Sequence, residues 1–165
     1  MKWMTYVGVG LALAFVPGLA SAKDAVTCGK GLICANNPET VAAALRAEGM
    51  KVAVTKDGEG DPKIESKMAG YNFSILFYGC EEHKLCDSLQ FYISFEDDGK
   101  NTPQLANKWN SGKRFLQMAA MDDGTLRVSY DVSTMGGLTA ANFTDVVDWW
   151  RTMLGELNIF FKDNG

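Results

Sequence analysis

Histidine is almost absent from this chain, since His83 is the one histidine among 165 residues. A Ser-His-Asp or Cys-His arrangement would therefore have to be built on this single side chain. The sequence also lacks Gly-x-Ser-x-Gly, His-Glu-x-x-His and a glycine-rich phosphate loop after a strand. We therefore expect no enzyme, no catalytic residue and no cofactor.

Clusters of basic residues are missing as well. The 16 basic and 20 acidic residues give a net charge of −4, and apart from Lys113-Arg114 the basic ones are spread singly along the chain. Nucleic acids and anionic membrane surfaces attract clustered Lys and Arg, so both are disfavoured as partners. No apolar run approaches the roughly 20 residues that span a bilayer, so no membrane span is expected.

The longest apolar run lies near the N-terminus and has the pattern of a secretory leader. Lys2 supplies a positive charge, residues 7–16 are apolar apart from glycine, and Ala20-Ser21-Ala22 offers the small residues that a signal peptidase requires. We expect cleavage after Ala22, which divides the chain into a signal peptide, residues 1–22, and one domain, residues 23–165. The domain would then be periplasmic or secreted.

Four cysteines follow the leader as two pairs of equal spacing, Cys28 with Cys34 and Cys80 with Cys86. Four cysteines allow three connectivities. Local pairing is preferred here because each pair flanks a short polar or glycine-containing turn, and an oxidising compartment allows the bridges to form.

A metal site is the alternative interpretation of the second pair. Cys80, His83 and Cys86 form a Cys-x2-His-x2-Cys cluster, to which Glu81, Glu82 or another cysteine could add a ligand. The oxidising compartment favours the disulfide instead, so no metal ligand is assigned.

The stretch around the second cysteine pair predicts a β-hairpin. Residues 72–78 and 88–95 alternate between apolar and polar, and side chains of a strand point to opposite faces with period two. In the second strand this places Leu89, Phe91, Ile93 and Phe95 on one face. Ser88, Gln90, Tyr92 and Ser94 then lie on a polar face.

The remaining elements predict an α+β fold with a single domain. Capping residues, prolines and glycines mark a short N-terminal helix from Pro38 to Gly49, with Asn37 as its capping side chain, and a short middle helix that starts after Thr102. Further strands are expected at 50–55, 63–68, 114–121 and 125–132, with a long C-terminal helix at 140–161. Hairpin connections between the strands indicate an antiparallel sheet.

The C-terminal helix carries two adjacent tryptophans. The predicted apolar stripe of this helix contains Phe143, Val147, Trp150, Leu154, Leu157 and Phe161. Adjacent helical residues lie about 100° apart, so we expect Trp150 in the core and Trp149 at its edge. An exposed aromatic ring can anchor a partner, which makes Trp149 a candidate partner-binding residue.

Several segments resemble the YbjN domain family. The resemblance rests on Gly70-Tyr-Asn-Phe-Ser-Ile-Leu-Phe-Tyr-Gly-Cys80, Cys86-Asp-Ser-Leu-Gln-Phe91, Asn107-Lys-Trp-Asn110, Lys113-Arg-Phe115, Asp123-Gly-Thr-Leu126 and Asp131. It spans roughly 38–161 and implies a fold like that of type III secretion chaperones. The family is usually described as sensory-transduction regulators, and the resemblance carries no catalytic residue to this chain.

Two functions of different classes follow. The preferred one is a non-enzymatic periplasmic protein-binding module, chaperone-like or regulatory, whose partner is another protein or a second copy of the chain in a homodimer. The alternative is a small periplasmic enzyme or metal-binding protein centred on the loop with Cys80, His83 and Cys86. The chain offers apolar surface more readily than convergent polar groups, which favours the binding module.

Overall fold

The computed structural model describes residues 28–164, so the expected leader and its cleavage point after Ala22 lie outside the described residues. In this part of the chain three helices and six strands follow one another as predicted, helix, four strands, helix, two strands, helix. Their bounds are α1 Pro38–Ala47, β1 Ala53–Lys56, β2 Pro62–Met68, β3 Tyr71–Tyr78, β4 Ser88–Phe95, α2 Pro103–Asn110, β5 Gln117–Ala120, β6 Leu126–Ser133 and α3 Ala140–Asn164. The fold class is α+β, as expected.

All six strands form one antiparallel sheet in the order β1-β2-β3-β4-β6-β5. In the predicted hairpin, Phe77 faces Leu89 and Ile75 faces Phe91 across the ladder. The next pair of strands places Phe91 opposite Tyr130. Because cross-strand partners share a face, this register gathers the apolar side chains of the central strands on one side of the sheet.

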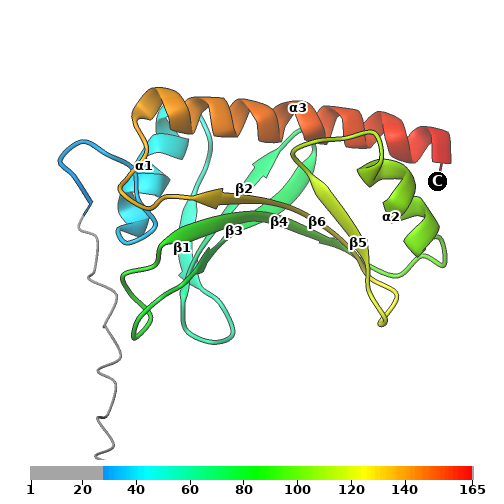
Figure 1. Ribbon diagram of the computed structural model, residues 1–165, viewed down its shortest axis with the longest axis horizontal. Coiled ribbons are helices and arrows are strands. Elements are labelled where there is room, and N and C mark those ends of the chain that lie inside the picture. The colour runs from blue at the N-terminus through cyan, green and yellow to red at the C-terminus, as the bar shows by residue number, and fades with distance from the viewer. Residues whose placement is uncertain (1–27, 165) are drawn as a thin grey trace, which may run out of the picture.

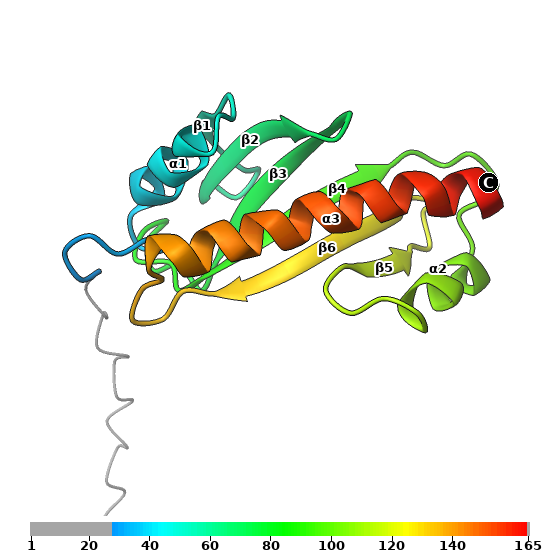
Figure 2. The ribbon, with the colours of Figure 1, turned by 90° about the horizontal axis from the view of Figure 1, so that it is seen from above.

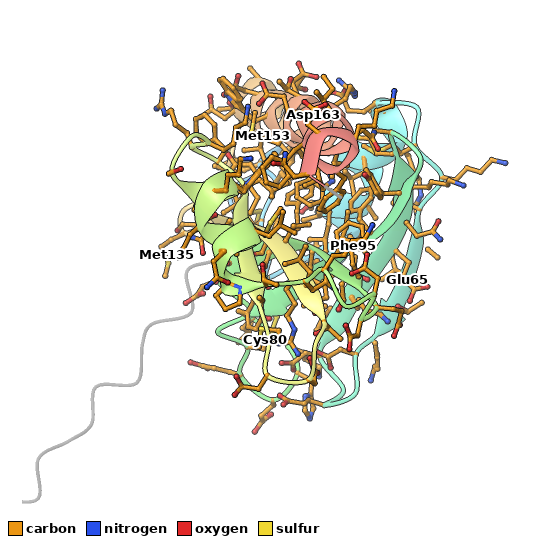
Figure 3. All side chains as sticks on the ribbon, turned by 90° about the vertical axis from the view of Figure 1, so that its right-hand side faces the viewer. Glu65, Cys80, Phe95, Met135, Met153 and Asp163 are labelled. Carbon is orange, nitrogen blue, oxygen red and sulfur yellow. A yellow bond between two sulfur atoms is a disulfide. The ribbon has the colours of Figure 1, made fainter. Side chains whose placement is uncertain are left out.

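Helix α3 covers that apolar side. Figure 1 shows it running along the whole sheet, while the turns between β1 and β2, between β3 and β4 and between β5 and β6 extend away from it. Trp150 is fully buried, and its ring lies 5.7 Å from that of Phe73 and 5.5 Å from that of Phe91. Viewed along α3, side chains including Phe95 fill the space between helix and sheet (Figure 3). The predicted apolar stripe of α3 therefore forms the centre of the core.

The two short helices flank α3 at opposite ends of the sheet, α1 beside β1 and β2, and α2 beside β5 (Figure 2). On α2, Trp109 is buried and donates its indole N–H to the Leu116 carbonyl at 2.7 Å. The next residue, Asn110, binds the edge strand β5. Its side-chain amide donates to the Met118 carbonyl and accepts from the Met118 N–H, each at 2.9 Å. Asn110 thus takes the place of a neighbouring strand at Met118.

The segment before α1 is held by a disulfide and by hydrogen bonds to the connection between β6 and α3. Cys28 and Cys34 are joined, and Ile33 forms an antiparallel bridge with Leu138. Thr134, which is buried, accepts from the Ala35 N–H and donates to the Asp87 carbonyl. Three distant parts of the chain therefore meet at one hydroxyl group.

Some predicted details are wrong. Asn37 occupies the N-cap position of α1, but its side chain accepts no capping bond. Thr40 provides the local bonds instead, donating to the Asn37 carbonyl and accepting from the Cys34 N–H. Strands β1 and β5 are four residues each, shorter than expected, and begin at Ala53 and Gln117, three residues after their predicted starts.

Helix α3 differs from its prediction at the C-terminal end. It continues to Asn164, beyond the predicted end at Phe161. Met153 is buried on its inner face, whereas Phe161 is only partly buried. None of the helices within residues 28–164 is long and apolar enough to cross a membrane.

Candidate functional site

The second disulfide closes the connection between β3 and β4. Cys80 is bonded to Cys86, as local pairing predicted, and Cys86 is buried. Within this loop Glu82, His83 and Leu85 have positive φ angles, a backbone conformation that L-residues adopt rarely. His83 Nδ1 lies 2.8 Å from Asp61 Oδ1, which links the loop to the turn between β1 and β2.

This bonding overturns the metal-centred alternative for the loop. A sulfur in a disulfide cannot serve as a thiolate ligand, so Cys80 and Cys86 leave His83 without its predicted co-ligands. Across residues 28–164 no cluster of three or more His, Cys, Asp or Glu side chains could hold a metal ion.

Trp149 lies on α3 where the sequence placed it, at the edge of the core. It is half-buried, and its ring lies 4.3 Å from that of Phe115, with an angle of 35° between the ring planes. Phe115 in turn contacts Tyr130 of the sheet, with ring centroids 5.9 Å apart. Part of the Trp149 surface is therefore already used inside the molecule.

Within residues 28–164 no helix covers the face of the sheet opposite α3 (Figure 1). Alternation along each strand directs polar and small side chains to it, and the ladder pairs them into rows. One row crosses four strands as Ser74, Tyr92, Ser129 and Gln117. A second crosses three strands as Leu76, Gln90 and Asp131. We call this surface, made of the outward residues of β3, β4, β6 and β5, the open face.

The open face is hollowed rather than flat. One hollow of about 390 Å³ is lined by Leu76, Tyr78, Gln90, Tyr92, Gln117, Ala119, Arg127 and Ser129. A second, of about 490 Å³, lies toward β2 and also has Tyr92 in its wall. Tyr92 therefore stands between two hollows of the same surface. Both hollows have volumes within the range of ligand-binding pockets.

Polar contacts order one side of the first hollow. The amide of Gln90 donates to Asp131 at 2.8 Å, and the Tyr78 hydroxyl donates to Gln90 Oε1 at 3.4 Å. Burial raises the pKa of the Tyr78 phenol, and the negative charge of Asp131 raises it further. Tyr78 therefore stays protonated and available as a donor well into the alkaline range.

Arg127 is the charged residue in the wall of the first hollow. Its Nε is buried, yet it has no hydrogen-bond partner within the described residues. An arginine in a folded protein normally pairs with a carboxylate or with carbonyl groups. The hollow thus contains an arginine whose buried Nε–H group has no hydrogen-bond partner within the described residues.

The sequence indicated the polar face but not this site. Alternation predicted Gln90 and Tyr92 on the polar face of β4, whereas Arg127 on β6 was not predicted as a site residue. Arg127 and Ser129 alternate with buried Val128 on β6. This pattern indicates that both side chains lie on the polar face of the sheet. The hollow itself forms between strands that are distant in the sequence, and their order in the sheet follows from tertiary pairing.

These features define a single-domain α+β protein with helices over one face of an antiparallel sheet and a hollowed face opposite. The chain belongs to the YbjN family. The family model, described as "Putative bacterial sensory transduction regulator", matches residues 37–157. The expected resemblance is therefore confirmed.

A solved structure has a similar fold. It is titled "Crystal structure of YbjN, a putative transcription regulator from E. coli" and superposes with a TM-score of 0.54 at 15% identity, covering 77% of this chain and 94% of that one. At this identity the likeness concerns the fold. Among curated proteins none matches this chain.

Proposed function

We propose that the protein is a non-enzymatic binding module that holds a polypeptide segment of another protein against its open face. The observation that carries this proposal is the hollowed, uncovered face of the sheet, with Tyr78 and Tyr92 in its walls. Tyrosine combines a rigid apolar ring with a hydroxyl group, and it is enriched where proteins bind one another. Regulation by binding agrees with the family description.

The place of action follows from the cysteines and the leader pattern. Two disulfides within residues 28–164 indicate that the protein folds in an oxidising compartment, because cytosolic reductants keep thiols reduced. The sequence before them has a charge, an apolar run and small residues in the order of a signal peptide. Together they support a periplasmic or secreted protein.

The experiment is capture of partners from the native envelope fraction by three folded variants. Tyr92→Glu places a charge between the two hollows, where burial against a partner is costly, and should reduce capture at least tenfold. Thr152→Glu puts the same charge on an exposed position of α3 and serves as the matched control. Circular dichroism must show that each variant folds.

Trp149→Glu tests the edge of α3 in the same assay, since that residue is the other candidate contact. Loss of capture in Trp149→Glu with retention in Tyr92→Glu would move the binding surface from the open face to α3. Sedimentation of the purified chain identifies self-association. A dimer that Tyr92→Glu dissociates would make the occupant a second copy of the chain.

A further inference from the structure

We propose that the hollow around Arg127 binds a carboxylate group. The inference rests on the proposed function, because it names the chemical group of the bound polypeptide that the open face recognises. That group is either the terminal carboxylate of a chain or the side chain of an acidic residue. The evidence is the position of Arg127, the groups beside it and the charges around it.

Arg127 projects from the open face between small neighbours. In the ladder it lies opposite Ser94 on β4 and Ala119 on β5, so neither flanking strand offers it a carboxylate. No ion pair or side-chain hydrogen bond involves it within residues 28–164, and its buried Nε lacks a partner. A guanidinium group presents its N–H donors in a planar fork that fits the two oxygens of a carboxylate.

Neutral hydrogen-bonding groups stand in the adjacent row. Tyr92, Ser129 and Gln117 are cross-strand neighbours two residues along the strands from Arg127, and all three line the same hollow. The side chain of none of them forms a hydrogen bond within the described residues. A carboxylate has about four lone-pair positions, more than one arginine fills, and these hydroxyl and amide groups are placed to serve the remainder.

The surrounding charges favour a singly charged anion. Arg127 is the one cation in the wall of the hollow, and Asp131 lies nearby, held by Gln90. Asp123, in the turn before β6, is exposed; hydrogen bonds from Thr125 mainly, and the charge of Arg127 in part, lower the pKa of its carboxyl. With two acids nearby, a doubly charged phosphate would be repelled more strongly than a singly charged carboxylate. Leu76 and Ala119 add apolar wall for the chain that carries the group.

The test uses three acetylated peptides and the NMR signal of the Arg127 Nε–H group in the full chain. The probes are tetra-alanine with a free terminal carboxylate, the same peptide as its amide, and Ala-Ala-Glu-Ala amide. We expect a saturable shift of the Arg127 signal with at least one carboxylate peptide and none with the neutral amide. Whether the first or the third probe binds distinguishes a chain end from an acidic side chain. A shift with all three probes, or with none, would overturn the proposal.

Variants test the role of the Arg127 guanidinium group. Arg127→Gln should weaken carboxylate binding roughly tenfold or more, as expected for loss of a charge-assisted hydrogen bond. The affinity of Arg127→Lys should lie between those of the parent and Arg127→Gln. Arg151→Gln removes an arginine from the exposed side of α3, where it pairs with Asp148, and should change nothing. Unchanged affinity in folded Arg127→Gln refutes the carboxylate site.

The two proposals can fail separately. If Tyr92→Glu loses its protein partner while no carboxylate peptide shifts Arg127, the binding face stands and the carboxylate site falls. If the carboxylate peptides bind but Tyr92→Glu keeps every partner, the carboxylate site stands and the proposed function falls.

Discussion

The hydroxyl of Thr134 accepts a hydrogen bond of 2.9 Å from the backbone N–H of Ala35, 99 residues earlier in the chain. The same hydroxyl donates to the Asp87 carbonyl at 3.0 Å. Both residues that pair with it are close in sequence to a cysteine, Ala35 to Cys34 and Asp87 to Cys86. Thr134 therefore joins the two disulfide-closed segments to the end of β6.

Thr134→Val should destabilise the protein by about 1 to 3 kcal/mol. Valine keeps the shape of the side chain but leaves the buried Ala35 N–H without its acceptor, which costs the desolvation of that group. Thr134→Ser keeps the hydroxyl and should cost less. Urea denaturation of the two variants measures the difference, and equal stability of Thr134→Val and the parent would show that the bridge is unimportant.

Trp150→Ala should cost about 3 to 5 kcal/mol, because the ring is fully buried between Phe73 and Phe91. His83→Ala should be close to neutral. Its side chain is 57% exposed, and an exposed ion pair such as that with Asp61 is worth at most about 1 kcal/mol. Chemical denaturation of both variants provides the comparison, and a larger loss for His83→Ala would contradict the described core.

Peptide mapping without reduction should recover Cys28 with Cys34 and Cys80 with Cys86. Replacing Cys80 and Cys86 together by serine should lower the free energy of unfolding by about 2 kcal/mol, as the chain-entropy model gives for so short a loop. A peptide that joins Cys28 to Cys80 would contradict both the local pairing and this estimate.

Stability should fall at alkaline pH, in part through Tyr78. Burial, and then the charge of Asp131, raise the pKa of its phenol above the ordinary value of 10.0. The contribution of Tyr78 to stability is therefore complete below pH 10.0 and is lost as the pH rises through the higher value of the folded state. Burial raises the pKa of Tyr71 and Tyr130 also.

Denaturation of Tyr78→Phe and the parent across this pH range checks that prediction. The variant should lose less stability than the parent between neutral and alkaline pH, because one group with a raised pKa is gone. Parallel curves for the two proteins would show that Tyr78 titrates as freely in the folded state as in the unfolded one.

The sequence predicted most of the fold because the central elements have strong local patterns. Alternation on β4 identified its buried face, and helical spacing identified Trp150 as a core residue. At Asn37 the predicted side-chain cap is missing, and the Thr40 N–H, which such a cap would bind, donates to the Asn37 backbone carbonyl instead. Neighbours brought together by tertiary pairing have no local signature, so Thr134 with Ala35 could not be predicted, nor could the hollow around Arg127.

The two edge strands of the sheet, β1 and β5, differ in how their outward backbone groups are covered, and Asn110 causes the difference. At β5 its amide already satisfies the outward N–H and carbonyl groups of Met118, so a foreign strand could add there only by displacing α2. At β1 all four residues are exposed. Edge-to-edge growth, the first step of many protein aggregates, is thus blocked at one border by a single side chain. One asparagine side chain would in this way limit edge-to-edge association of the sheet at β5.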